Sequence, residues 1–312
     1  MPEWLIERGI GETRAALVEN EAIVEARIQL EGTVSTGTVL AARLAQAARP
    51  AFAVADGEEY LLPRGAPGVS EGAAVNIEVT REKIPGAEPW KRPLARVTDE
   101  APRQPQPFEG RELLLPAGEL GDAGWDELIE QARTGVVAFG GGELRIAATP
   151  AMTSIDVDGF LDPAELAVRG AAEAARAIRR LDIGGSIGID LPTVGSKTAR
   201  QAAAAALDEV LPQPFERTAV NGFGFLQVVR PRARASLIEL AQDRAAFETR
   251  ALLRRTAFEG PGAKRLVAHP AVAKVLEAHP GWLDALARQL GGAIGLRADP
   301  SLPMSGAYAE SA

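Results

Sequence analysis

The sequence contains no cysteine and only two histidines, His269 and His279. Disulfides, thiolate zinc sites and histidine-rich metal centres are therefore excluded, and any metal would need oxygen ligands. Long apolar runs are also missing, because no stretch approaches the roughly 20 residues that span a bilayer. The first residues, MPEWLIERGIGETR, carry charges where a signal peptide would be apolar. We therefore expect a cytoplasmic protein without a membrane partner.

An excess of basic over acidic residues is missing as well, since the 312 residues have a formal net charge of −8. Residues 1–150 hold 15 Lys and Arg against 24 Asp and Glu, whereas residues 151–234 hold 10 of each. This balance argues mildly against a polyanionic partner, which usually meets a basic face. The arginines of the central segment either meet phosphates or form solvated helix faces.

Alternating apolar and polar residues predict a strand-rich N-terminal half. Residues 1–31 predict two or three antiparallel strands, and five short strands between Thr33 and Thr98 suit a small β-barrel of the oligonucleotide-binding kind. APRQPQPFEG, residues 101–110, is a proline-rich linker. In the second half, PAELAVRGAAEAARAIRRLDIGG begins with Pro163 and ends in two glycines, which predicts a helix.

Two acid-bearing strands frame this helix. ATPAMTSIDVDGF, residues 148–160, contains Asp156 and Asp158, and SIGIDLP ends its strand in Asp190. Sites in α/β folds lie at the carboxyl ends of strands, so we expect Asp156 and Asp190 side by side. Two close carboxylates repel each other unless they share a proton or bind a hard cation, for which Mg²⁺ fits best and Mn²⁺ is the alternative. The other interpretation is that both acids are exposed strand-end or capping residues.

Three segments resemble, in order and with close spacing, the catalytic core of the ribonuclease E/G endoribonucleases. They are GGGELRIAATPAMTSIDVDG, AELAVRGAAEAARAIRRLDIGGSIGIDLP and TAVNGFGFLQVVRPR. In that family the first segment ends in a metal-binding Asp followed two residues later by Asn, and the second supplies the other metal-binding Asp. The resemblance implies that Asp156 and Asp190 hold the metal, and that Asp158, which replaces the Asn, orients a water.

The resemblance also implies an α+β or α/β architecture. In the family an S1-type RNA-binding barrel is inserted into a ribonuclease-H-like subdomain, and a DNase-I-like catalytic subdomain and a small C-terminal αβ domain follow. The expected parts are residues 1–33 with 99–148, the barrel 34–98, the catalytic subdomain 149–250 and a C-terminal remnant 251–312.

RNA-binding residues follow from the same resemblance. AFAVADGEEYLLP matches a segment with two RNA-facing aromatic residues: Phe52 takes the first position, and Leu61, with Tyr60 beside it, the second. Phe52 could equally be an ordinary barrel-core residue. The basic residues expected to contact RNA are Lys91, Arg92, Lys197, Arg200, Arg230 and Arg232.

Several parts of the family are missing. The segment that carries its pocket for a 5′-terminal phosphate is replaced by the linker and one short helix, so we expect no sensing of the 5′ end. The CPxC motif of its zinc link is absent, so we expect no zinc and no zinc-linked dimer, and the oligomeric state stays open. The run DLPTV also lacks the second Asp that the family has after Asp190.

The sequence therefore predicts a magnesium-dependent endoribonuclease that cleaves single-stranded RNA to 5′-phosphate and 3′-hydroxyl ends. The alternative is a non-catalytic RNA-binding protein that keeps the fold, which the acidic balance and Asp158 favour. Retention of both metal-binding aspartates favours the enzyme. A hydrolase of small phosphate esters would leave the barrel unexplained.

Overall fold

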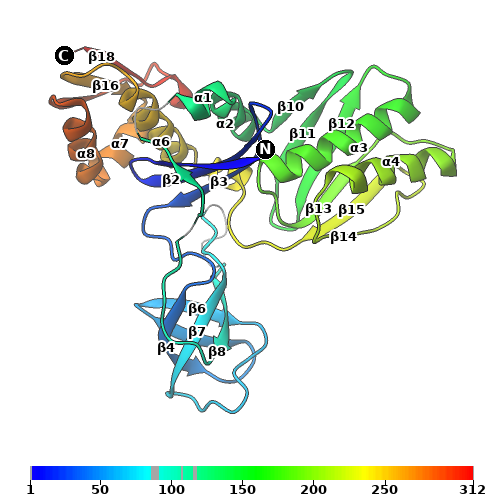
Figure 1. Cartoon of the computed structure of the whole chain (residues 1–312), viewed down its shortest axis with the longest axis horizontal. Helices are drawn as coiled ribbons and strands as arrows, with labels where there is room; N and C mark the ends of the chain where they lie inside the picture. Colours follow the sequence, from blue (N-terminus) through cyan, green and yellow to red (C-terminus); the bar gives the residue numbers. More distant parts are fainter. Residues whose placement is uncertain (1, 86–90, 107, 115–117, 312) are drawn as a thin grey trace.

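The computed structural model describes residues 2–85, 91–106, 108–114 and 118–311 (Figure 1). A sheet near the N-terminus occupies the middle of the molecule, with the C-terminal unit on one side and an α/β layer on the other. A small barrel projects from this body (Figure 1). Among the described residues, the helices include none that is long and apolar enough to cross a membrane.

The central sheet is begun before the barrel and completed after it. Its antiparallel strands are β1 (Glu3–Arg8), β2 (Glu12–Glu19) and β3 (Ala22–Leu30), as the alternation predicts. After the barrel, β9 (Arg111–Glu112) pairs in parallel with β1, and α1 (Glu119–Asp122) and α2 (Trp125–Thr134) follow. The barrel is therefore an insertion into this sheet unit.

The inserted segment forms a closed five-stranded barrel in the order β4-β5-β6-β8-β7. Its strands are β4 (Val39–Gln46), β5 (Ala51–Ala55), β6 (Glu58–Leu62), β7 (Ala74–Arg81) and β8 (Leu94–Thr98). Alternate side chains such as Leu44, Leu62 and Ile77 point inward and are at most 2% exposed. The predicted small barrel of five strands is confirmed, and the structure shows that it is closed.

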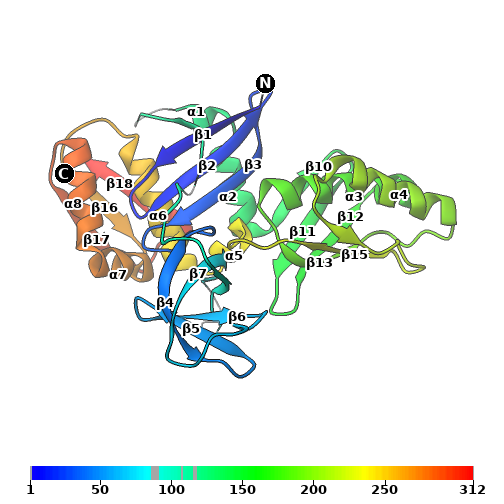
Figure 2. The same ribbon diagram turned by 60° about the horizontal axis from the view of Figure 1, so that its bottom comes forward.

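A six-stranded sheet follows in the order β10-β11-β12-β13-β15-β14. Its strands are β10 (Val136–Phe139), β11 (Gly142–Ala148), β12 (Thr153–Gly159), β13 (Gly185–Asp190), β14 (Glu216–Arg217) and β15 (Phe225–Arg230). Figure 2 shows α3 (Pro163–Arg180) and α4 (Lys197–Val210) over one face of this sheet. At Gly170 of α3 a Cβ atom would lie 2.3 Å from Val157 Cγ1, so glycine permits the close approach of helix and strand.

This sheet corrects one predicted boundary. β10 and β11 were placed with the N-terminal unit, which was expected to end at residue 148, but β11 forms a hairpin with β12 along its whole length. The ladder hydrogen bonds and the shared core tie residues 136–148 to the acid-bearing strands. The α/β layer therefore begins near residue 136.

The C-terminal unit is a three-stranded sheet with helices. It is preceded by α5 (Leu237–Leu240), whose buried side chains pack into the main core. Its elements are α6 (Arg244–Ala257), β16 (Lys264–Ala268), α7 (Pro270–Ala278), α8 (Pro280–Leu290), β17 (Ile294–Ala298), the 3₁₀ helix η1 (Met304–Gly306) and β18 (Tyr308–Ser311). α6 begins before the predicted boundary at residue 251 and joins two cores. Phe247 packs into the main core, whereas Leu252 and Leu253 pack into the C-terminal one.

Candidate active site

Asp156 and Asp190 lie opposite each other on neighbouring strands. β12 and β13 run in parallel, and their register pairs Asp156 with Asp190. Neighbouring strands are about 4.8 Å apart, and paired residues project to the same face of a sheet. The structure therefore brings together the two acids that the sequence placed side by side.

Both acids lie on the face of the sheet that α3 and α4 leave open. Val157 is buried toward α3, whereas Asp156 and Asp158, on either side of it, are exposed. Across the β11–β12 ladder, Glu143 lies opposite Asp158 and Arg145 opposite Asp156. We call the four carboxylates Glu143, Asp156, Asp158 and Asp190 the acidic edge.

The charges of the acidic edge raise the free energy of its ionised state. The pKa of Asp156 is raised by partial burial and, beyond that, by the negative charges of Asp158 and Asp190. Arg145 lowers this pKa in opposition, but its guanidinium also forms an ion pair with Glu143 at 2.5 Å. A bound cation would relieve this repulsion.

The donors of the acidic edge suit a hard cation that keeps most of its water. Within the described stretches there is no group of three or more His, Asp or Glu side chains arranged to hold a metal ion. Mg²⁺ is commonly bound by one or two carboxylates and takes its other ligands from water and substrate phosphate, and Mn²⁺ accepts the same oxygen donors. The pair Asp156 and Asp190 fits that requirement.

Lys197 and Arg200 follow the strand that ends in Asp190. Lys197 is the first residue of α4, and its side chain is exposed. Arg200 turns back, and its Nη1 donates to the backbone oxygens of Val194 at 2.8 Å and Gly195 at 3.0 Å. Lys197 is therefore exposed at the start of α4, whereas Arg200 fixes the loop after Asp190.

Arg230 and Arg232 lie at the other end of the sheet. The β13–β15 register places Arg230 at the end of β13 opposite to Asp190. Its Nη1 donates to the Ile183 carbonyl at 3.0 Å, and burial lowers the pKa of Arg230. Arg232 forms an ion pair with Glu239. The structure does not bring these two predicted RNA-binding residues to the acidic edge.

Phe52 lies on the outside of the barrel and is half-buried. The guanidinium carbon of Arg92 lies 4.7 Å from the centre of its ring, and Arg92 Nε donates to Glu59 at 2.6 Å. Leu61 pairs with Phe52 across β5 and β6. A base that stacks on Phe52 would have to displace Arg92 or stack beside it.

The prediction for Tyr60 is wrong. Its side chain is 2% exposed inside the barrel core, because alternate residues of β6 point inward, so no base can stack on it. Lys91 lies away from the barrel surface, in a recess that Thr149, Arg232 and Glu239 also line. It therefore faces the junction between the barrel and the α/β layer.

Two exposed phenylalanines that the sequence did not single out end up beside the acidic edge. Phe160 directly follows β12 and is 86% exposed. Phe223 is 82% exposed and precedes Phe225, which pairs with Asp190. The Asn221 carboxamide oxygen accepts hydrogen bonds from the backbone N–H groups of Phe223 at 2.9 Å and Phe225 at 3.1 Å, which fixes this loop.

Both rings are exposed in the free protein and are available for contact with a ligand. Burying a phenylalanine side chain is worth about 1.5–3 kcal/mol, and neither ring gains this in the free protein. Both residues adjoin glycines in the sequence, Gly159 before Phe160 and Gly224 after Phe223. The sequence could have indicated the exposure of Phe160 and Phe223, because each stands beside a turn glycine, whereas core phenylalanines usually lie within a strand or helix pattern.

No model of a known protein family matches the chain, and no curated protein matches it either. The function is therefore inferred from the acidic edge and the surfaces around it.

Proposed function

We propose that the protein is a minimal ribonuclease E/G-type enzyme, a magnesium-dependent endoribonuclease that cleaves single-stranded RNA without sensing its 5′ end. The observation that carries the proposal is the pairing of Asp156 with Asp190 at the carboxyl ends of parallel strands on an open sheet face. The inserted barrel supports it, because barrels of this kind often hold single-stranded nucleic acid.

Under this proposal each part of the fold has a counterpart in the family. The N-terminal sheet with β9 corresponds to the ribonuclease-H-like subdomain, and the barrel corresponds to the S1-type domain. The six-stranded layer corresponds to the DNase-I-like catalytic subdomain, and the sheet β17-β16-β18 to the small C-terminal domain.

The residues of the acidic edge would divide the chemistry. Asp156 and Asp190 would hold Mg²⁺, which when bound polarises the scissile phosphate and activates a water for in-line attack. Asp158 would accept a hydrogen bond from the attacking water and orient it. Lys197 would neutralise a backbone phosphate. The products would carry 5′-phosphate and 3′-hydroxyl ends.

The direct test is incubation with a fluorescent A/U-rich single strand in Mg²⁺ and then in EDTA. We expect cleavage in Mg²⁺ and none in EDTA, with products that accept ligation at their new 5′-phosphate. Cleavage that persists in EDTA would contradict the role of the acidic edge.

A non-catalytic RNA-binding protein is the second candidate. It is favoured by Asp158, which replaces the family's Asn and faces Glu143 across the ladder, so that the acidic edge gains a further negative charge. Binding of the same strand without cleavage in either Mg²⁺ or Mn²⁺ would support this candidate over the enzyme.

Removing the exposed rings beside the acidic edge should weaken RNA binding. Stacking of a base on an aromatic side chain is worth about 1–3 kcal/mol, so Phe160→Ala and Phe223→Ala should each raise the Kd about five- to hundredfold. Fluorescence anisotropy with a labelled single strand at fixed salt measures the change.

Leu114→Ala is the matched control, because Leu114 is 87% exposed but lies in the segment before α1. Its Kd should equal that of the wild type. Unchanged Kd values in both phenylalanine variants would exclude these rings as base platforms.

A further inference from the structure

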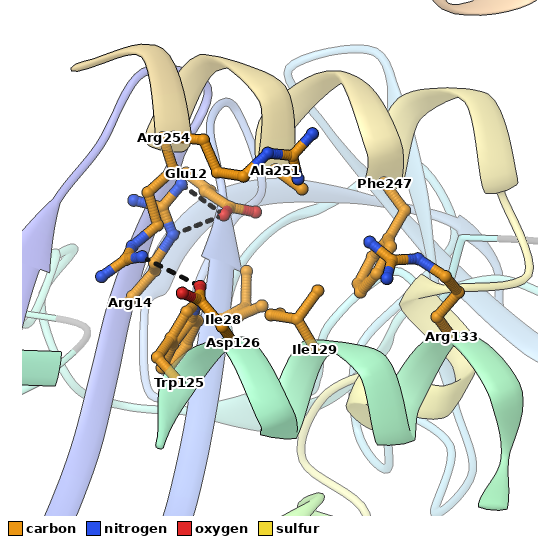
Figure 3. A pocket seen from close by; sticks show the side chains of 11 residues that line it. Glu12, Arg14, Ile28, Trp125, Asp126, Ile129, Arg133, Phe247, Ala251 and Arg254 are labelled. Atoms are coloured by element: carbon orange, nitrogen blue, oxygen red, sulfur yellow. Dashed lines mark hydrogen bonds and ion pairs between the residues drawn. The ribbon is translucent and has the colours of Figure 1, made fainter. Parts of the chain in front are cut away.

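A cavity of about 250 Å³ lies between α2, α6 and the N-terminal sheet (Figure 3). It is lined by no residue of the acidic edge. Figure 3 shows side chains gathered at its two ends, with Glu12, Arg14, Asp126 and Arg254 at one end and Arg133 and Phe247 at the other.

The first end is electrically balanced by its own ion pairs. Arg14 Nε donates to Glu12 at 2.7 Å, and Arg254 Nη1 reaches the Asp126 carboxylate at 3.4 Å. Each guanidinium that lines this end therefore has a carboxylate partner. This end needs no further anion.

Arg255 also lines the cavity and has a different environment. It is half-buried, and its Nη2 donates to the backbone oxygen of Ala307 at 3.1 Å. No carboxylate within the described part of the chain forms an ion pair with it. Burial lowers the pKa of Arg255, and the positive charge of Arg133 lowers it further, whereas the negative charges of Glu248 and Asp126 raise it in opposition.

The nearby carboxylates are already engaged. Glu248 is 1% exposed and accepts from Arg133 at 2.6 and 2.9 Å, and Arg244 lies 3.4 Å from it. Glu130 forms an ion pair with Arg133 from the surface, where solvent screens its charge. Positive charge is therefore in excess where Arg133 and Arg255 line the cavity.

The remaining walls are apolar and aromatic. Trp125, Phe247 and Ile129 also line the cavity, and Trp125 and Phe247 are almost fully buried. The volume lies just below the range of about 300–1,000 Å³ for small-molecule sites, so a small ligand is required.

We propose that this cavity binds a phosphomonoester of at most mononucleotide size. Its phosphate would lie between Arg133 and Arg255, because planar guanidinium groups bind phosphate oxygens through paired charge-assisted hydrogen bonds. Its organic part would lie against Trp125 and Phe247. The phosphomonoester group can belong to a free nucleotide or to the end of an RNA.

The test measures binding of inorganic phosphate and of adenosine 5′-monophosphate to the full chain by calorimetry and thermal shift, with sodium chloride matching the ionic strength. We expect both to bind, the nucleotide more tightly. Arg255→Gln should weaken both about tenfold or more, because it removes a charge-assisted contact. Arg64→Gln, on an exposed barrel turn, makes the same charge change and should bind like the wild type.

A second variant leaves every charge in place. Ala251 lines the cavity from α6, so Ala251→Leu should fill it and abolish nucleotide binding. If Arg255→Gln fails to fold, Ala251→Leu still tests whether the nucleotide binds in this cavity. No binding to the wild type, or unchanged binding in Ala251→Leu, would overturn the proposal.

Two RNAs that differ only in a 5′-phosphate or 5′-hydroxyl identify the source of the ester. Displacement of the bound nucleotide by the phosphorylated RNA alone would assign the site to an RNA end. Displacement by neither would assign it to a free ester. Both results support the site, but the first would contradict the absence of 5′-end sensing in the proposed function.

Discussion

Replacement of Asp156 or Asp190 by Asn is expected to abolish RNA cleavage while the fold and RNA binding persist. The two carboxylates face each other across β12 and β13, and an amide removes the negative charge that holds the cation at almost unchanged volume. We expect the single-turnover rate to fall at least about a hundredfold, since removal of one important electrostatic contact commonly costs 10²–10³ in rate. Full activity in either variant would contradict the assignment.

Asp158→Asn is the informative control on the same strand. It restores the residue of the resembled family and removes a negative charge that raises the pKa of Asp156. Cleavage should therefore be kept or become faster. A loss as large as that of Asp156→Asn would make Asp158 a direct metal ligand.

The pairing of Asp156 with Asp190 should also affect the stability of the protein in the absence of RNA. The pKa of Asp156 is higher in the folded chain than in the unfolded chain. Its contribution to the free energy of unfolding therefore falls as the pH rises from the pKa of the unfolded chain through that of the folded chain. Mg²⁺ held by both carboxylates should offset this loss. We expect Mg²⁺ to raise the melting temperature of the wild type at neutral pH but not that of Asp190→Asn.

The sequence predicted that Asp156 and Asp190 lie side by side because the local signals around the intervening helix agree. Asp162 accepts a hydrogen bond from the Ala164 backbone N–H at 3.0 Å, and Pro163 occupies the first helical position, so the start of α3 is unambiguous. A strand, a helix and a second parallel strand then leave little freedom for the placement of Asp156 and Asp190.

Other features depend on long-range packing that the sequence does not reveal. The side of the barrel on which Tyr60 lies depends on strand register, and a shift of one residue reverses it. The exposure of Phe160 and Phe223 depends on what the loops meet in space. The role of residues 136–148 depended on whether β11 pairs forward with β12 or backward with the N-terminal sheet.

The least predictable feature is a buried ion cluster between β1, β2 and α6. Glu7 and Glu12 are bonded to Arg14, and they also bind Arg254 and Arg250 of α6, respectively. In the sequence these residues look like the solvated positions of strands and a helix. In the structure all five are buried, Glu7 completely.

Removing Glu7 should therefore destabilise the protein strongly. Its carboxylate accepts from Arg14 Nη1 at 2.7 Å and from Arg254 Nε at 2.9 Å, and Glu7→Ala leaves those buried guanidinium groups short of a counter-charge. Breaking a buried ion pair in this way costs about 3–5 kcal/mol. Chemical denaturation of the full chain should show a loss of that size.

The control is Glu3→Ala, because Glu3 forms its ion pair with Arg111 on the surface. The loss of unfolding free energy in Glu3→Ala should stay below about 1 kcal/mol. The double variant Glu7→Met with Arg254→Met should recover much of the stability, since apolar side chains of similar volume can replace a buried pair. If Glu7→Ala unfolds at the same denaturant concentration as the wild type, the cluster does not hold α6 to the N-terminal sheet.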